Sequence, residues 1–180
     1  MTRLGALILA GGASRRMGAD KASQDWGGAR AVDRVARLAA RAKADPVLVC
    51  GADLGLPFVA DPFPRAGPVA GLLAGVAALG RLGRDRCLVL AVDAPTLRPG
   101  DLEALFASPE GAAFAGFPLP MVLPMDAVPA DAAADWPLRR FVERAGLRAP
   151  PCPVGAEMRI RGANTLEERQ MLLADRGDGA

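Results

Sequence analysis

Histidine and tyrosine are both absent from this chain of 180 residues. Their absence excludes hydrolysis by a Ser-His-Asp triad, zinc sites built on imidazole, and tyrosine as a catalytic acid. Lysine is almost as scarce, because Lys21 and Lys43 are the only lysines among the 22 basic residues. Any chemistry must therefore come from carboxylates, lysine, arginine, backbone amides, or a metal ion held by oxygen ligands.

Cysteine and net charge are also low. Cys50, Cys87 and Cys152 are odd in number and include no Cys-x-x-Cys zinc pair, which indicates reduced thiols in a cytoplasmic protein. The formal net charge of +2 predicts neither a nucleic-acid nor a membrane partner. Because no apolar run is long enough to span a bilayer and the first residues lack signal-peptide architecture, we expect a cytoplasmic location.

Short apolar runs alternate with longer amphipathic segments along the chain. This alternation is typical of βα units around a largely parallel sheet. Strands are predicted at residues 4–10, 46–50, 57–60 and 87–92, with two more within 112–125. Helices are predicted at residues 29–43, from Pro68, from Pro99, at 136–144 and after the capping-box pair Thr165 and Glu168.

A glycine-rich loop, Leu9 to Lys21, follows the first predicted strand. Ligands of open α/β sheets bind beyond the carboxyl ends of the strands, so the loop has the right location for a ligand. Gly11 and Gly12 let backbone amides approach a phosphate, while Arg16 and Lys21 could neutralise the β and γ phosphates of a nucleotide. The sequence is neither a P-loop nor a dinucleotide-binding turn. The alternative interpretation is a plain strand-to-helix connection.

Three further features could belong to the same site. Asp93 comes just after the predicted strand at 87–92, where a carboxylate can hold Mg²⁺ against nucleotide phosphates. The small residues of Gly67–Gly71 open a helix against which a flat base could pack, and Asp61 could contact the ribose or base. Each feature also has a structural interpretation, because an aspartate is common in turns and small residues are common in helix packing.

These motifs resemble those of the molybdenum cofactor guanylyltransferase family, the MobA-type enzymes. The family's Leu-Ala-Gly-Gly, Arg-Met-Gly, Asp-Lys, Gly-Pro-x-Ala-Gly, Asp-x-Pro and Asn-Thr-x-Glu-Glu occur in order as Leu9–Gly12, Arg16–Gly18, Asp20-Lys21, Gly67–Gly71, Asp93–Pro95 and Asn164–Glu168. The resemblance implies an α/β, Rossmann-like three-layer nucleotidyltransferase fold with a mostly parallel central sheet. The chain length fits one domain, residues 1–180, with a nucleotide-binding half at 1–110, an acceptor-side half at 111–174 and a frayed tail at 175–180.

The resemblance further implies transfer of GMP from GTP to the terminal phosphate of Mo-molybdopterin, with Mg²⁺ as cofactor and pyrophosphate as product. The implied catalytic residues are Arg16, Lys21 and Asp93, with Asp93 on the metal. The implied nucleotide-binding residues are Leu9, Ala10, Gly11, Gly12, Lys21, Asp61, Gly67, Gly71 and Asp93. Asn164 would lie on the acceptor side, or would simply be a polar residue before the Thr165 cap. Transient contacts with cofactor-pathway proteins or apo-molybdoenzymes are also expected.

The chain departs from the family pattern at three places. It has Cys50-Gly51-Ala52 where the family often has asparagine after its second strand, and Gly162-Ala163-Asn164 where the family has Asn-x-Asn. It also has Gly28-Ala29-Arg30-Ala31 where the family usually has Gly-Lys-Pro-Leu after the loop. Two alternatives therefore stay open: a cytidylyltransferase of the same pathway, and a non-catalytic protein that binds and delivers the molybdenum cofactor.

Overall fold

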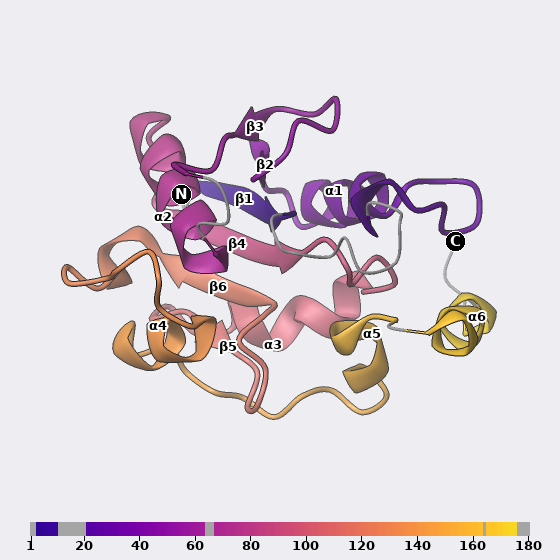
Figure 1. Cartoon of the computed structure of the whole chain (residues 1–180). Coiled ribbons are helices and arrows are strands. Elements are labelled where there is room, and N and C mark those ends of the chain that lie inside the picture. The colour runs from indigo at the N-terminus through magenta and orange to yellow at the C-terminus, as the bar shows by residue number, and fades with distance from the viewer. Residues whose placement is uncertain (1–2, 11–20, 64–66, 164, 176–180) are drawn as a thin grey trace.

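A six-stranded sheet forms the centre of the molecule (Figure 1). The computed structural model describes residues 3–10, 21–63, 67–163 and 165–175. The strands lie in the order β3-β2-β1-β4-β6-β5, and β6 runs antiparallel to both of its neighbours. Their bounds are Leu4–Leu9 for β1, Val47–Cys50 for β2, Phe58–Val59 for β3, Arg86–Ala91 for β4, Ala112–Ala113 for β5 and Met121–Pro124 for β6. The predicted α/β class with a mostly parallel sheet is confirmed.

The apolar composition of β1 and β4 explains their central position. Leu7 of β1 pairs with Val89 of β4, and both side chains are fully buried. Strands with apolar side chains on both faces are stable only where helices cover both faces of the sheet. The strand order reverses at β1, because β2 lies on one side of it and β4 on the other. Ligand sites of such sheets lie at this switch point, beyond the carboxyl ends of the strands.

Helices form a layer on each face of the sheet (Figure 1). One face packs against α1, α3 and α5, and the other packs against α2 and α4. The last helix, α6, lies beside α1, where its Leu172 packs against Trp26 and Ala31. The bounds are Ala31–Arg41 for α1, Pro68–Arg81 for α2, Glu103–Phe106 for α3, Leu138–Arg144 for α4, Glu157–Arg161 for α5 and Leu166–Ala174 for α6. Short 3-10 turns lie at Lys21–Ser23 (η2), Pro99–Leu102 (η3) and Met125–Ala127 (η4).

Each predicted strand and helix occurs, and most differences lie at element ends. The helix predicted over 29–43 begins only at Ala31. Before it, Gly27 and Gly28 have positive φ and form a turn, which is closed by an antiparallel backbone β-bridge between Asp25 and Arg30. The helix predicted from Pro99 consists of η3 followed by a single turn, α3. The capping box of Thr165 and Glu168 is confirmed by two reciprocal hydrogen bonds of 3.1 Å.

A buried ion pair joins the C-terminal part of the chain to the rest. The Arg159 guanidinium of α5 donates two hydrogen bonds to the Asp101 carboxylate of η3, at 2.6 and 2.9 Å. Arg159 and Arg98 also pair with Asp175. Two arginines thus contact Asp175, the first residue of the predicted tail, and residues 176–180 lie outside the described residues. Within the described ranges, no helix is both long and apolar enough to cross a membrane.

Candidate functional site

The candidate site lies along the edge where the parallel strands end. The Ala10 N–H donates to the Cys50 carbonyl at 3.0 Å, and the Val92 N–H donates to the Leu9 carbonyl at 3.2 Å. These bonds extend the sheet one residue beyond β1 and bring the ends of β2, β1 and β4 side by side. Leu9 is buried and Ala10 is half-buried, so backbone rather than side chain is available at this point. Residues that follow these strands are thereby gathered at one edge.

Lys21 and Asp93 come together beyond β1 and β4. Asp93 is half-buried in the turn after β4, and Lys21 opens η2. Burial raises the pKa of the Asp93 carboxyl, and the nearby positive charge of Lys21 partly opposes this by lowering it. Lys21, the last residue of the glycine-rich loop, therefore lies near enough to the carboxylate after β4 to influence its pKa. In this arrangement the lysine could bind a phosphate while the aspartate binds a metal ion.

Asp61 and Gly71 also come together, at the ends of β2 and β3. A Cβ at Gly71 would lie 3.2 Å from an Asp61 carboxylate oxygen and 3.4 Å from the Cys50 Cβ, so only a very small residue fits there. Burial raises the pKa of Asp61. Burial and the neighbouring Asp61 charge together raise the pKa of the Cys50 thiol to about 12, so Cys50 stays protonated at neutral pH.

Gly67 begins the helix that carries Gly71. Its φ of 85° lies in the region that favours glycine, and Pro68 occupies the first turn of α2. Gly67 is exposed, and the nearest atom to a Cβ there would be the Ala134 carbonyl oxygen at 3.8 Å. Its conformation therefore serves the turn into α2. The other predicted site residues, Gly11, Gly12, Arg16 and Asn164, lie outside the described residues.

Gly162 is a site residue that the sequence did not reveal. Its φ is 68°, and a Cβ built there would overlap the Asp93 carbonyl oxygen. The chain after α5 thus lies directly against the Asp93 backbone, two residues before Asn164. The available signal was a glycine just after a short helix, which is more often a simple helix end.

Arg34 is a second residue whose role the sequence did not reveal. Its guanidinium donates to the Trp26 carbonyl at 2.6 Å and to the Pro95 carbonyl at 3.1 Å. Trp26 follows Lys21 by five residues, and Pro95 follows Asp93 by two. Arg34 therefore ties the segments that carry Lys21 and Asp93 to the same helix.

The MobA-like NTP transferase domain family matches residues 6–148 of the 180. The chain belongs to this family. The resemblance inferred from the motifs is thereby confirmed, and the matched region includes Lys21, Asp61, Gly71 and Asp93. A solved MobA-like structure, the molybdopterin-guanine dinucleotide biosynthesis protein A of Archaeoglobus fulgidus, has a TM-score of 0.60 and 20% identity and covers 95% of this chain and 97% of its own. That likeness shows the shared fold.

Curated relatives of this MobA-like chain carry one kind of name. A molybdenum cofactor guanylyltransferase of Cereibacter sphaeroides is 43% identical over 120 residues, which are 61% of this chain and 60% of the relative. A probable molybdenum cofactor guanylyltransferase of Opitutus terrae is 32% identical over 190 residues, covering 92% of this chain and 93% of the relative. The match to the first relative thus spans less than two thirds of that protein's length.

The oxygen donors near Asp93 suit a magnesium ion that takes most of its coordinating oxygens from a phosphate compound and from water. Within the described residues, no three acidic or cysteine side chains lie close enough to form a metal cage. Mg²⁺ commonly uses only one or two carboxylates and takes its other oxygens from phosphates and water. The single Asp93 carboxylate beside Lys21 therefore fits such an ion.

Proposed function

We propose that this chain is a molybdenum cofactor guanylyltransferase, which transfers GMP from GTP to the terminal phosphate of Mo-molybdopterin. The proposal rests on one observation above all, the approach of Lys21 to Asp93 at the switch point of the sheet. Nucleotide phosphates bind at this position in open α/β sheets. The choice of guanine as the base and of the molybdenum cofactor as the acceptor rests on the names of the curated relatives.

The bond changes need no histidine. An oxygen of the molybdopterin phosphate attacks the α-phosphorus of GTP and forms a new phosphoanhydride bond. The bond from the α-phosphorus to the bridging oxygen breaks, and its electrons leave with pyrophosphate. A phosphate monoester has a second pKa of about 6 and is already largely dianionic at neutral pH. Positioning and charge stabilisation are then sufficient for catalysis.

The cationic residues would stabilise the leaving group. Lys21 and Arg16, with the amides of Gly11 and Gly12, would neutralise the negative charge that develops on pyrophosphate. Asp93 would hold Mg²⁺, which supplies Lewis-acid charge neutralisation at the phosphates. Lys21 would have a second role, because its charge lowers the pKa of the Asp93 carboxyl and so opposes the effect of burial.

The nucleoside and the acceptor would occupy opposite parts of the site. Asp61 would bind the ribose or base, beside the backbone of Leu9, Ala10, Gly67 and Gly71; the absence of a side chain at Gly71 leaves room for the Asp61 carboxylate. Asn164 would orient the pterin-side substrate. Transient contacts with cofactor-pathway proteins or apo-molybdoenzymes, and a cytoplasmic location, belong to the same proposal.

A pyrophosphate-release assay tests the proposal. Purified protein is given Mo-molybdopterin and either GTP or CTP, with and without Mg²⁺. We expect GTP-dependent release, and we expect Lys21→Ala and Asp93→Ala each to lower turnover at least about 100-fold, the scale of a lost transition-state contact. Lys43→Gln, at the other lysine, is the matched control and should retain turnover.

Each competing function predicts a different result. Release with CTP in preference to GTP would identify a cytidylyltransferase. Cofactor binding without release of pyrophosphate from either nucleotide would identify a delivery protein. Near-normal turnover in both the Lys21→Ala and Asp93→Ala variants would contradict the mechanism.

A further inference from the structure

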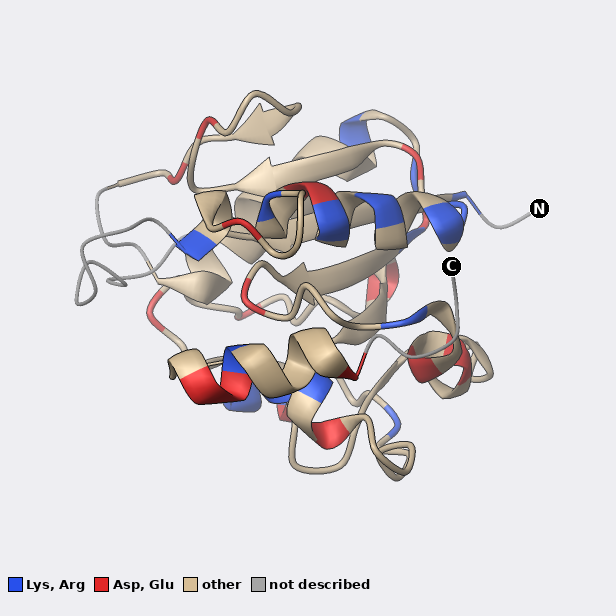
Figure 2. Ribbon diagram, turned by 90° about the vertical axis from the view of Figure 1, so that its right-hand side faces the viewer, with Lys and Arg blue, Asp and Glu red and all other residues tan. Residues whose placement is uncertain are grey.

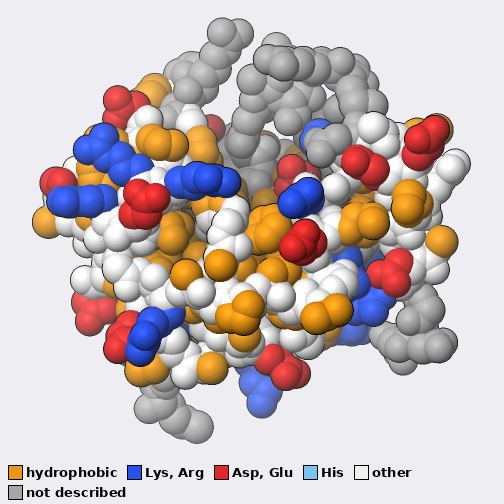
Figure 3. Space-filling model, turned by 90° about the horizontal axis from the view of Figure 1, so that it is seen from below, with side chains coloured by type: hydrophobic (Ala, Val, Ile, Leu, Met, Phe, Trp, Pro, Cys, Tyr) orange, Lys and Arg blue, Asp and Glu red, His pale blue; other side chains and the backbone are white. Residues whose placement is uncertain are grey.

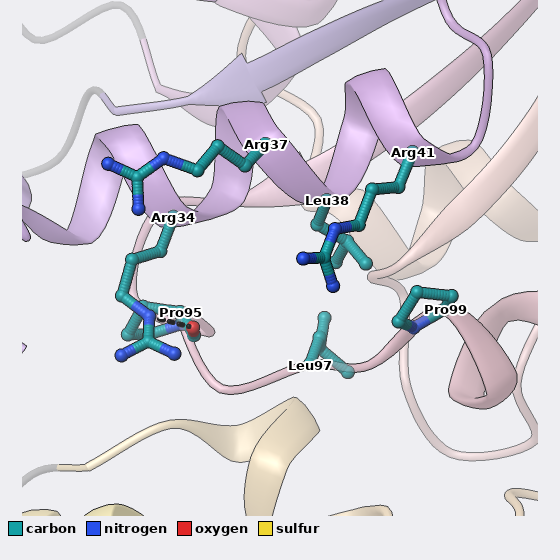
Figure 4. Close-up of a pocket in the computed structure, with 7 residues that line it drawn as sticks. All are labelled: Arg34, Arg37, Leu38, Arg41, Pro95, Leu97 and Pro99. Atoms are coloured by element: carbon teal, nitrogen blue, oxygen red, sulfur yellow. Dashed lines mark hydrogen bonds between the residues drawn. The ribbon is translucent and has the colours of Figure 1, made fainter. Parts of the chain in front are cut away.

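A small pocket lies between α1 and the segment that follows Asp93 (Figure 4). Its volume is about 140 Å³. The residues that line it are Arg34, Arg37, Leu38, Arg41, Pro95, Leu97 and Pro99. None of them is assigned to the nucleotide, although Arg34 and Pro95 also hold the segment that carries Asp93. The pocket is therefore a neighbour of the nucleotide site, on the other side of that segment.

The basic side chains around this pocket differ from other arginines of the protein. Figure 4 shows Arg34 and Arg41 reaching from α1 toward the segment of Pro95 and Pro99. Among the described residues, no carboxylate lines the pocket, and neither the Arg37 nor the Arg41 guanidinium has a hydrogen bond or ion pair. The Asp33 carboxylate pairs with Arg30, and the charge of Arg37 also lowers its pKa. Figure 2 shows how closely basic residues follow one another along α1.

Elsewhere, many arginines are neutralised by neighbouring carboxylates. Ion pairs are found for Arg3, Arg30, Arg84, Arg98, Arg144, Arg148, Arg159 and Arg161. The face seen in Figure 3 likewise shows basic and acidic side chains next to one another. Within the described part of the chain, Arg37 and Arg41 form no such ion pair, and with Arg34 they place three arginines around one pocket, an arrangement that favours an anion.

The pocket is small and basic, which suits a compact anion. Arg34 is held in place by its bonds to two backbone carbonyls, so little side-chain entropy is lost when it meets a ligand. Leu38 and Leu97 are buried and form an apolar floor, which strengthens charge interactions above it. Sites for drug-sized ligands usually measure about 300–1,000 Å³, so this one has room for a single anionic group but not for a nucleotide.

We propose that this arginine pocket binds a phosphate group, either inorganic phosphate or the phosphate of a small monoester. Guanidinium groups bind phosphate through paired, charge-assisted hydrogen bonds, and Arg37 and Arg41 have donors free for this purpose. Pro95 and Leu97 belong to the segment that begins at Asp93, so an anion in the pocket contacts the back of that segment. The proposal does not depend on the reaction that the chain catalyses.

Phosphate binding can be followed by NMR through the backbone amides of residues 34–41 and 96–98 and the Nε–H signals of the pocket arginines. The protein is titrated with sodium phosphate and with phenyl phosphate at constant ionic strength, in the Lys21→Ala background, which weakens competing binding at the nucleotide site. We expect saturable shifts at these signals, and Arg37→Gln with Arg41→Gln should weaken binding at least about tenfold. Arg81→Gln with Arg139→Gln removes two exposed arginines elsewhere and should leave binding unchanged.

The two ligands separate the two sources of phosphate. Tighter binding of phenyl phosphate indicates a monoester whose apolar part lies on Leu38 and Leu97, and equal binding indicates the free ion. Chloride at matched ionic strength must not reproduce the shifts. The proposal is overturned if neither ligand gives saturable shifts, or if the Arg37 and Arg41 substitutions leave the affinity unchanged. Pyrophosphate release is not measured, so failure here and failure of the proposed reaction are distinguishable.

Discussion

At the scale of single residues, Gly162 has little freedom to change, because it combines positive φ with direct contact to the Asp93 backbone. We expect Gly162→Ala to displace Asp93 and to lower turnover about 10- to 100-fold, as small misplacements of catalytic groups do. Gly155→Ala is the matched control, since Gly155 has a φ of 76° and nothing within 4 Å of an added Cβ. Equal losses of turnover in the two variants would show that backbone strain alone is responsible.

The Asp61 carboxyl lowers the free energy of unfolding at neutral pH, because burial raises its pKa. The folded state then binds the Asp61 proton more tightly than the unfolded state. Stability is therefore lost as pH rises from the ordinary aspartate value through the raised pKa. We expect Asp61→Asn to increase the Tm at pH 7, on the order of 2 °C, with no increase below pH 3. Asp135→Asn, at an exposed position, is the control for thermal unfolding across this pH range. A gain that is independent of pH would contradict this account.

At the scale of elements, α1 fixes the relation between the two charged segments of the site through Arg34. Loss of its bonds to the Trp26 and Pro95 carbonyls should loosen both segments. We expect Arg34→Gln to lower kcat about tenfold with a smaller change in the KM for GTP, because alignment is lost more than binding. Arg34→Lys, which can reach only one carbonyl well, should restore part of kcat. Steady-state kinetics with Arg81→Gln as control test this, and a change confined to KM would argue against a positioning role.

Periodicity predicted the elements well, because burial of one face imposes a regular spacing of apolar residues. Residues 4–10 and 87–92 were predicted as strands because they are short apolar runs, as expected for parallel strands covered on both faces. Asp93 could then be placed at the sheet edge from the strand alone. Contacts between residues that are far apart in the sequence could not be predicted, because they depend on how the finished elements pack. Gly162 reaches Asp93 only after α5 docks, and Arg34 bonds to carbonyls 8 and 61 residues away.

At the scale of the whole molecule, the buried pair of Arg159 and Asp101 couples the two halves of the chain. Their side chains are only 10% and 7% exposed, so removing one charge leaves the other buried without its partner. Such a loss costs about 3–5 kcal/mol. We expect Arg159→Met to lower the free energy of unfolding by that amount in urea. Arg161→Met, which breaks an exposed pair on the same helix, should change it by less than about 1 kcal/mol.

The two tryptophans can report whether residues 1–180 unfold as one domain. Trp26 lies in the predicted nucleotide-binding half and Trp136 in the acceptor-side half, and both are buried. Because one sheet runs through both halves, Trp26→Phe and Trp136→Phe should each leave a single reporter with the same m-value and one transition. Adding Arg159→Met to each variant should then move both transitions to lower urea by equal amounts. If only the Trp136 signal moved, the halves would be separate folding units, and the buried pair would stabilise only the acceptor side.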